Sequence, residues 1–184
     1  MRCFVAVPLP DALAGRVGAV QRRLGRGWDR VDVRWSDPAA AHVTLKFLGR
    51  VEPAGLAALQ AMLAAEASEH RATRVSLGTV GAFPSPRRAR VVWLGLGDGG
   101  DALAQIAAGI DRGAAALGFA PEARLYTPHL TLGRVRAPRA GANLAGTLDV
   151  AVRGSWTVDA IVLYESRLRP AGAVHVPLAA WPLA

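Results

Sequence analysis

The sequence is poor in cysteine, in lysine and in long apolar runs. Its one cysteine, Cys3, cannot form an internal disulfide, so a disulfide-stapled fold is excluded. No window reaches the roughly 18 uncharged apolar residues that a membrane span requires. The segment Met1–Pro10 lacks the long apolar stretch and the cleavage site of a signal peptide. We therefore expect a cytoplasmic protein that does not contact a membrane.

The basic residues are almost all arginine. Lys46 is the sole lysine among 22 basic residues, and the formal net charge is +8. A positive charge of this size favours a polyanionic partner such as nucleic acid. The arginines are scattered, however, so a genome-wide compositional bias explains them equally well. With 184 residues, of which 52% are hydrophobic and 20% charged, the chain is predicted to form one globular domain, residues 1–184.

Hydrophobic periodicity predicts a mixture of strands and helices. Strands are expected at 2–9, 31–35, 42–48, 74–83, 89–96, 125–135, 156–164 and 173–178. Helices are expected at 10–24, 53–69 and 101–117, with a loop and a short helix in 138–146. Because the strands and helices do not alternate regularly, an α+β fold with largely antiparallel sheets is predicted.

One tetrapeptide pattern, His-apolar-Thr-apolar, occurs twice. The copies start at His42 and His129, which are 87 residues apart, close to half the chain. Successive side chains of a strand point to opposite faces, so histidine and threonine share one face and the apolar residues share the other. The spacing predicts two lobes related by duplication, each of which presents one tetrapeptide.

Two facing imidazoles and two hydroxyls suit phosphodiester cleavage. A neutral imidazole can accept a proton and a protonated one can donate it, while threonine hydroxyls can donate hydrogen bonds to an anionic oxygen. A single such histidine is more simply explained as a hydrogen-bonded residue of a half-buried strand. A zinc site would need three or four ligands, and no carboxylate lies within four residues of either copy. The pair therefore favours acid–base chemistry without a metal.

The sequence resembles the 2H phosphoesterase superfamily, and specifically the bacterial and archaeal RNA 2′,3′-cyclic phosphodiesterases once named 2′-5′ RNA ligases. The segments that carry the resemblance are 2–10, 33–35, 42–49, 81–84, 90–95, 128–134 and 163–166. The resemblance implies a bilobal α+β fold, in which two pseudo-symmetric lobes with antiparallel sheets and outer helices surround a central cleft. The chain differs from the family at Gly133, where alanine is frequent, and at His175, where an aromatic residue is common.

The resemblance also implies a reaction and roles for four residues. The family opens 2′,3′-cyclic phosphate ends of RNA to 2′-phosphates. By this resemblance His42 is the proton donor to the leaving 3′ oxygen and His129 is the proton acceptor that activates water. Thr44 and Thr131 hold the non-bridging phosphate oxygens. The expected partner is RNA with a cyclic phosphate end or a small cyclic nucleotide, no cofactor or metal is expected, and the protein is expected to be a monomer.

Four further residues are candidates for substrate binding. Strict alternation places Lys46 on the face of His42, whereas Arg134 reaches the site only if its strand contains a bulge. Tyr126 could stack on a nucleobase or pack in the fold, and Arg90 could bind an RNA phosphate or lie in solvent. Phe47 has the opposite parity to His42 and is expected in the core.

Two other functions remain open at this point. The same histidines, acting in reverse, would join a cyclic phosphate to a 5′-hydroxyl in a 2′-5′ bond. A non-catalytic module that binds RNA ends would keep the cleft without turnover. The intact His and Thr residues of both tetrapeptides argue against such a module.

Overall fold

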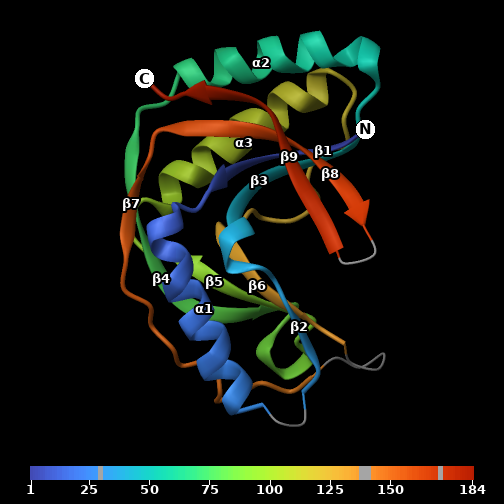
Figure 1. The fold of residues 1–184 in the computed structure, drawn as a ribbon. Coiled ribbons are helices and arrows are strands. Elements are labelled where there is room, and N and C mark those ends of the chain that lie inside the picture. The colour runs from blue at the N-terminus through green and yellow to red at the C-terminus, as the bar shows by residue number, and fades with distance from the viewer. Residues whose placement is uncertain (29–30, 137–141, 170–171) are drawn as a thin grey trace.

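The computed structural model describes residues 1–28, 31–136, 142–169 and 172–184. Within these residues, nine strands are joined by antiparallel pairing (Figure 1). They are β1 (Arg2–Pro8), β2 (Val33–Trp35), β3 (His42–Arg50), β4 (Thr73–Phe83), β5 (Val91–Leu96), β6 (His129–Val135), β7 (Ser155–Val158), β8 (Ala160–Arg169) and β9 (Gly172–Pro182). Three α-helices accompany them: α1 (Asp11–Arg26), α2 (Leu56–Ser68) and α3 (Gly100–Ala116).

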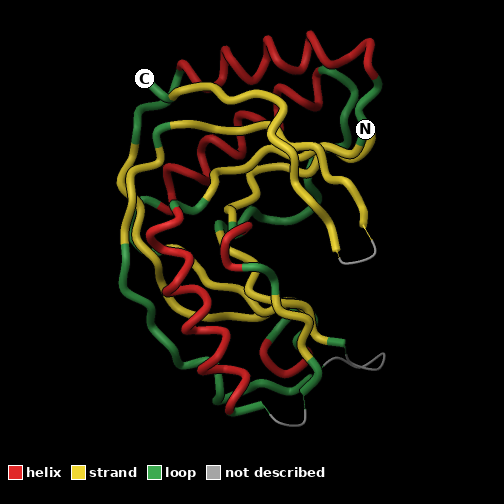
Figure 2. Tube along the Cα trace, in the orientation of Figure 1, coloured by secondary structure: helices red, strands yellow, loops and turns green. Residues whose placement is uncertain are grey.

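The strand order is symmetric about its centre. It runs β7-β4-β5-β6-β3-β1-β8-β9, with β2 paired to the free end of β6. The two central strands, β6 and β3, share a single residue pair, Val43 with Leu130, and the strands on either side diverge from there (Figure 2). Four strands of this order form each half, β2 adds a fifth to the half that contains β6, and the predicted bilobal α+β fold is confirmed.

Each lobe is covered by a helix that follows a strand of the other lobe. α1 follows β1 but packs on β6, where the Gln21 side-chain amide donates a hydrogen bond of 3.0 Å to the Leu132 carbonyl. Its apolar stripe at Leu13, Val17 and Leu24 is buried, as helical spacing requires. α3 follows β5 but lies behind β3, and α2 packs on α3 (Figure 1).

Because α1 and α3 each pack on the lobe opposite to the strand that they follow, they join the two lobes through contacts between residues far apart in the sequence. Buried residues from both lobes, including Val5, Leu45, Leu94 and Leu132, belong to one hydrophobic cluster.

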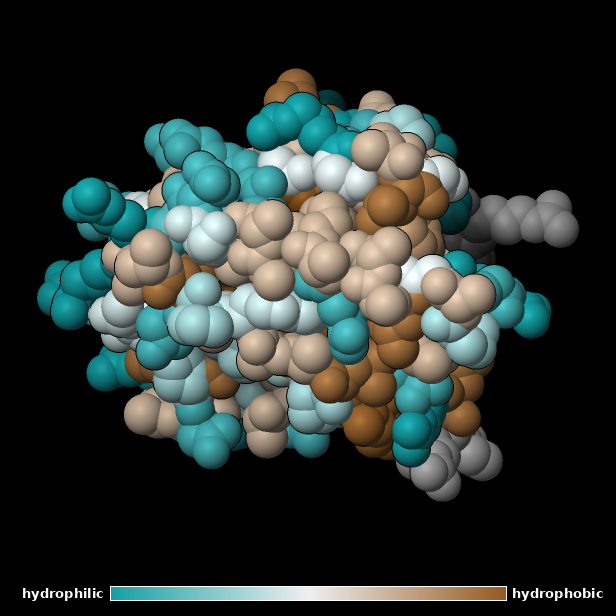
Figure 3. Space-filling model, turned by 90° about the horizontal axis from the view of Figure 1, so that it is seen from above, coloured by the Kyte–Doolittle hydropathy of each residue, from teal (hydrophilic) through white to brown (hydrophobic). Residues whose placement is uncertain are grey.

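Seen from the side of α2, polar and weakly apolar residues alternate over the surface, and the most hydrophobic ones gather at one edge (Figure 3). No helix of the described part is long and apolar enough to cross a membrane.

Several predicted boundaries were wrong. The strand expected at 125–135 begins only at His129, because the residues before it form an irregular segment tied to α3 and β3 by side-chain hydrogen bonds. The strand expected at 156–164 is divided at Asp159 into β7 and β8, and β8 and β9 extend beyond the expected ends because they form one hairpin. Of the short helix expected in 138–146, residues 138–141 lie outside the described residues, and residues 142–146 contain no helix.

Candidate active site

The two tetrapeptides meet at the centre of the molecule. Val43 and Leu130, the second residue of each, are paired and fully buried. Antiparallel pairing around this point places Thr131 next to His42 and Thr44 next to His129. All four side chains are half-buried, on the face opposite the core. Both motifs therefore lie on one open face, related by an approximate twofold axis.

Both histidine rings are held in the same way. The Nδ1 atom of His42 lies 2.9 Å from the Ala40 carbonyl oxygen, and that of His129 lies 2.6 Å from the Thr127 carbonyl oxygen. A carbonyl can only accept, so each Nδ1 carries the proton and donates it. In the neutral ring, Nε2 is then the free base. Each motif thus presents one Nε2 atom whose tautomer is set by the residue two positions earlier.

An aromatic ring contacts each of the two histidines. The centroid of Phe4 lies 5.0 Å from that of His42, and the centroid of Phe83 lies 5.1 Å from that of His129. Burial lowers the pKa of both imidazoles below the usual value, and the carbonyl hydrogen bonds oppose this effect only in part. Because desolvation penalises the cation, both rings are neutral more readily than a solvated histidine.

His175 is a third imidazole beside the first motif. It lies on β9, with its ring centroid 5.1 Å from that of His42 and 4.9 Å from that of Phe4, edge-on to both. Burial lowers its pKa too, and its charge disfavours protonation of His42. Among the described residues, its buried Nδ1 has no hydrogen-bond partner. The departure from the family at this position therefore lies in direct contact with the ring of the first motif.

Each motif contains a β-bulge at its fourth residue. In β3, Thr44 pairs with Ala6 but Lys46 pairs with Val5, so the leucine between them is an extra residue. In β6, Thr131 pairs with Trp93 but Gly133 pairs with Val92, and again the intervening leucine is extra. A bulge reverses which face the following residues occupy.

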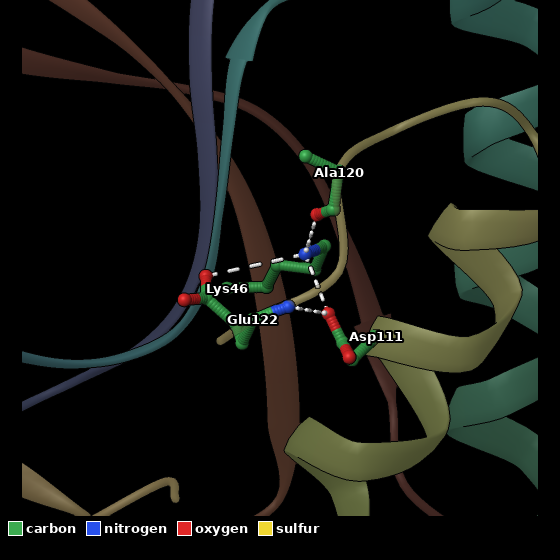
Figure 4. A network of polar contacts seen from close by, with 4 residues as sticks. All are labelled: Lys46, Asp111, Ala120 and Glu122. Atoms are coloured by element: carbon green, nitrogen blue, oxygen red, sulfur yellow. Dashed lines mark hydrogen bonds and ion pairs between the residues drawn. The ribbon is translucent and has the colours of Figure 1, made fainter. Parts of the chain in front are cut away.

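The prediction for Lys46 was therefore wrong. The bulge turns its side chain into the protein, where it is fully buried. Its ammonium group donates to Asp111 Oδ1 at 2.6 Å and to the Ala120 carbonyl at 2.9 Å, and Glu122 lies 4.0 Å away (Figure 4). The hydrogen bond from the ammonium group holds the pKa of Asp111 below its usual value. Lys46 joins β3 to α3 and does not face the substrate side.

The same bulge corrects the prediction for Phe47. This side chain was expected in the core, but it is 64% exposed and lies on the open face beside Phe4, with a centroid distance of 6.1 Å. It occupies the position in β3 that Arg134 occupies in β6, three residues after the motif threonine. One lobe thus presents an aromatic ring where the other presents a cation.

Arg134 lies on the open face, where a residue that binds substrate has to be. The bulge in β6 leaves it exposed, and its charge contributes to the lowered pKa of His129. Gly133 is buried beneath β2, where a Cβ atom would come within 2.8 Å of the Val33 side chain. At this position β2 packs too closely on β6 for a methyl group to fit without a shift.

The other two candidates lie near the site with different surroundings. Tyr126 is partly buried, and its hydroxyl donates to the Thr44 carbonyl at 2.8 Å. Burial raises the pKa of Tyr126, so its hydroxyl stays protonated and its hydrogen bond links the segment before the second motif to the first motif. Arg90 is exposed just before β5, and its carbonyl accepts a hydrogen bond from the Val135 amide.

Sequence reasoning missed the residues that support the site. Phe4 and Phe83 lie 38 and 46 residues before the histidines that they contact, and Asp111 lies 65 residues after Lys46. The segments around Phe4 and Phe83 were noted only for their resemblance. No periodicity signals such partners, because they meet only when distant strands pair.

A family model described as the 2′-5′ RNA ligase superfamily matches residues 9–169. This chain belongs to that superfamily. A protein of Methanothermobacter thermautotrophicus named RNA 2′,3′-cyclic phosphodiesterase is 33% identical over 181 residues, which cover 97% of this chain and 96% of the relative. A protein of the same name from Aeropyrum pernix is 37% identical over 141 residues, covering 74% of this chain and 78% of the relative.

Solved structures agree with this family assignment. A crystal structure of a Thermus thermophilus protein has a TM-score of 0.83 and 27% sequence identity, and the match covers 100% of this chain and 98% of that one. The predicted membership in the 2H phosphoesterases, and with it the prediction of an enzyme of this family, is confirmed.

Proposed function

We propose that this member of the superfamily hydrolyses 2′,3′-cyclic phosphate ends of RNA to 2′-phosphates. The observation that supports this most strongly is the symmetric pair of imidazoles. His42 and His129 are both held through Nδ1 by a backbone carbonyl and lie on the open face around the Val43–Leu130 pair. Two proton-transfer groups of the same kind suit a displacement at phosphorus that needs a base on one side and an acid on the other.

The proposed reaction is one in-line displacement. His129 Nε2 accepts a proton from water as its oxygen forms a bond to phosphorus. The bond from phosphorus to the 3′ oxygen breaks, and that oxygen takes the proton from His42 Nε2. Hydroxyl groups of Thr44 and Thr131 donate hydrogen bonds to the non-bridging oxygens, which stabilises the charge that develops there. The product is a 2′-phosphate with a free 3′-hydroxyl.

Phosphorus NMR tests the proposal in one experiment. An oligonucleotide ending in a 2′,3′-cyclic phosphate is incubated with enzyme and EDTA, and we expect the cyclic signal to be replaced by that of a 2′-monophosphate. Among the described residues, no group of three His, Cys, Asp or Glu side chains is arranged to hold a metal. Activity lost with EDTA and restored by zinc or manganese would contradict the metal-independent mechanism. Formation of a 3′-monophosphate instead would show that the leaving group is the 2′ oxygen and not the 3′ oxygen.

The same assay separates the two alternatives. An RNA with a 5′-hydroxyl is added, and a new diester signal that grows at the expense of the 2′-phosphate would indicate 2′-5′ ligation. Binding of the cyclic end without any change in its signal would indicate a non-catalytic module. We expect hydrolysis to dominate, because water greatly exceeds any RNA hydroxyl in dilute solution.

The pH dependence of kcat/KM is expected to be bell-shaped, with its maximum below pH 6.5. The base must be neutral and the acid protonated, so rates fall on both sides of two imidazole pKa values. Burial lowers the pKa of both His42 and His129, which moves both limbs to lower pH. Initial rates with a cyclic mononucleotide between about pH 4 and pH 9 measure this. A maximum at pH 8 or above would contradict the assignment of both limbs to these rings.

A further inference from the structure

We propose that Tyr126 is a positioning residue for the second imidazole: its hydrogen bond to the strand of the first motif fixes the backbone segment that orients His129. This inference rests on the proposed function, because it names a residue that supports the reaction without touching the substrate. It gives the tyrosine a role other than stacking on a nucleobase, and it makes the geometry of one motif depend on the other.

A short chain of contacts leads from the first motif to the second imidazole. The Tyr126 hydroxyl donates a hydrogen bond of 2.8 Å to the Thr44 carbonyl. The next residue, Thr127, provides the carbonyl oxygen that lies 2.6 Å from Nδ1 of His129. The atom that sets the tautomer of His129 therefore belongs to the residue directly after the anchored tyrosine. A shift of this segment would move the carbonyl and release the imidazole.

The segment before His129 has few other anchors. Residues 119–128 contain no helix or strand, and within the described part of the chain the backbone of 121–127 makes no hydrogen bond to another backbone group. Side chains of β3 and α3 hold its first part, at the Ala120 carbonyl and the Glu122 amide. The hydrogen bond of Tyr126 lies closest to the histidine, three residues before it. The position of the Thr127 carbonyl therefore depends on this side chain.

The segment before the first histidine is held by its main chain. The residues that precede His42 form a 3₁₀ turn, Pro38–Ala40. The Leu9 amide donates a hydrogen bond of 3.0 Å to the carbonyl of Ala41, directly before that histidine. The position that corresponds to the tyrosine in this lobe is Ala39, whose side chain cannot form a hydrogen bond. Backbone contacts therefore orient the first imidazole, whereas a side chain is needed for the second.

The surroundings of Tyr126 suit an anchor. Its ring packs against the hydrophobic cluster, which restricts the movement of the side chain. Since burial raises the pKa of the Tyr126 hydroxyl, this group remains a hydrogen-bond donor at neutral pH. The acceptor, the Thr44 carbonyl, lies directly before the extra residue of the bulge in β3. A bulge interrupts the regular ladder, so a donor from a side chain satisfies a backbone group there.

The first test is the kinetics of Tyr126→Phe, which keeps the ring and removes only the hydroxyl. We expect kcat to fall roughly tenfold, the equivalent of about 1.4 kcal/mol, because the second imidazole is less well oriented. KM for a cyclic mononucleotide should change by less than about twofold, since no group that binds substrate is removed. A substrate with a nitrophenolate leaving group should affect Tyr126→Phe in the same way as His129→Ala, whichever histidine is the acid.

Nitrogen NMR of the imidazoles provides a readout that needs no turnover. At about pH 8 both rings are neutral, and in the wild type His129 and His42 should each show a protonated Nδ1 and a free Nε2. In Tyr126→Phe, we expect the two nitrogen signals of His129 to move toward each other, because the Thr127 carbonyl no longer selects one tautomer. The signals of His42 should stay in place, since its carbonyl is held by the main chain.

Thr147→Val is the matched control. The Thr147 hydroxyl is also partly buried and donates to a backbone carbonyl, that of Leu144, at 2.7 Å. It lies beside Trp28 after the end of α1, so its removal should leave kcat and both histidine tautomers unchanged.

The two readouts separate the positioning role from the proposed function. Unchanged His129 signals in Tyr126→Phe, or changes at the first histidine alone, would overturn the positioning role. A kcat of Tyr126→Phe equal to that of an active wild type would also overturn it, as expected if the ring merely stacks on a base or packs in the fold. Changed His129 signals in a protein whose wild type has no turnover would support the orientation of the ring by Tyr126 and reject the hydrolysis.

Discussion

Alanine at His42 or at His129 is expected to lower kcat by roughly 10²–10⁴, the usual contribution of one positioned proton-transfer group. Each Nε2 atom has its tautomer set by a carbonyl, which fixes the geometry of the proton transfer. The double variant should lose little more than the worse single variant, because groups that act as a unit are not additive. Steady-state kinetics with a cyclic-ended dinucleotide measure these changes.

His70→Ala is the control for a histidine outside the site. His70 lies after α2 and is paired with Glu66 at 2.8 Å, so its removal should leave kcat unchanged. Full activity of either His42→Ala or His129→Ala would exclude the two-histidine mechanism.

A substrate with a nitrophenolate leaving group is expected to separate the roles of the two histidines. Such a leaving group needs no proton, so it should restore activity to His42→Ala, which lacks the acid. It should not restore His129→Ala, because water still has to lose a proton. Rescue of His129→Ala alone would show that the acid and the base are reversed.

Asp111→Ala is expected to destabilise the protein by about 3 kcal/mol, more than removal of its partner. The Lys46 side chain has no exposed surface, and without Asp111 its ammonium keeps only the Ala120 carbonyl and the distant Glu122 carboxylate. Breaking a buried pair by removing one partner leaves an uncompensated charge, which is strongly destabilising. Urea unfolding of both proteins measures the difference.

Lys46→Met should cost less than about 1.5 kcal/mol, because methionine fills a similar volume without a charge. Asp111 is 26% exposed and still accepts a hydrogen bond from the Glu122 amide at 3.1 Å, so it stays solvated and bonded. A larger loss for Lys46→Met than for Asp111→Ala would contradict this account of the network.

The difference between wild type and Lys46→Met should also depend on pH. The pKa of Asp111 is lowered in the folded state by the Lys46 hydrogen bond. Its contribution to stability is therefore complete above the unfolded value of about 3.9 and is lost as the pH falls through the lower folded value. The stabilities of the two proteins should converge below about pH 4, as measured by urea unfolding at several pH values.

The sequence by itself was sufficient to predict the fold class and the face on which the tetrapeptide histidines and threonines lie. The period of two in each tetrapeptide predicts that His42 and Thr44 share one face, and His129 and Thr131 another, because alternation is a local property of any strand. The repetition at half the chain length predicts the two lobes. Both predictions depend on short-range geometry, and the structure places all four side chains as expected.

Local alternation failed where a bulge interrupts it. The bulge after Thr131 was considered for Arg134, but the equivalent one after Thr44 was not, so Lys46 and Phe47 were assigned to each other's faces. No residue type in the tetrapeptide marks the bulge, since the extra residue is an ordinary leucine in both lobes. The pairing of β3 with β1, and of β6 with β5, decides where the extra residue lies.

Only the tertiary structure decided which residues support and extend the site. Phe4 and Phe83 contact the half-buried histidine rings through pairings between strands that are far apart in sequence. Asp111 contacts Lys46 because α3 follows β5 of one lobe but packs on β3 of the other lobe. The physical reason is general: alternation and charge are encoded residue by residue, whereas register and helix placement result from packing the whole core at once.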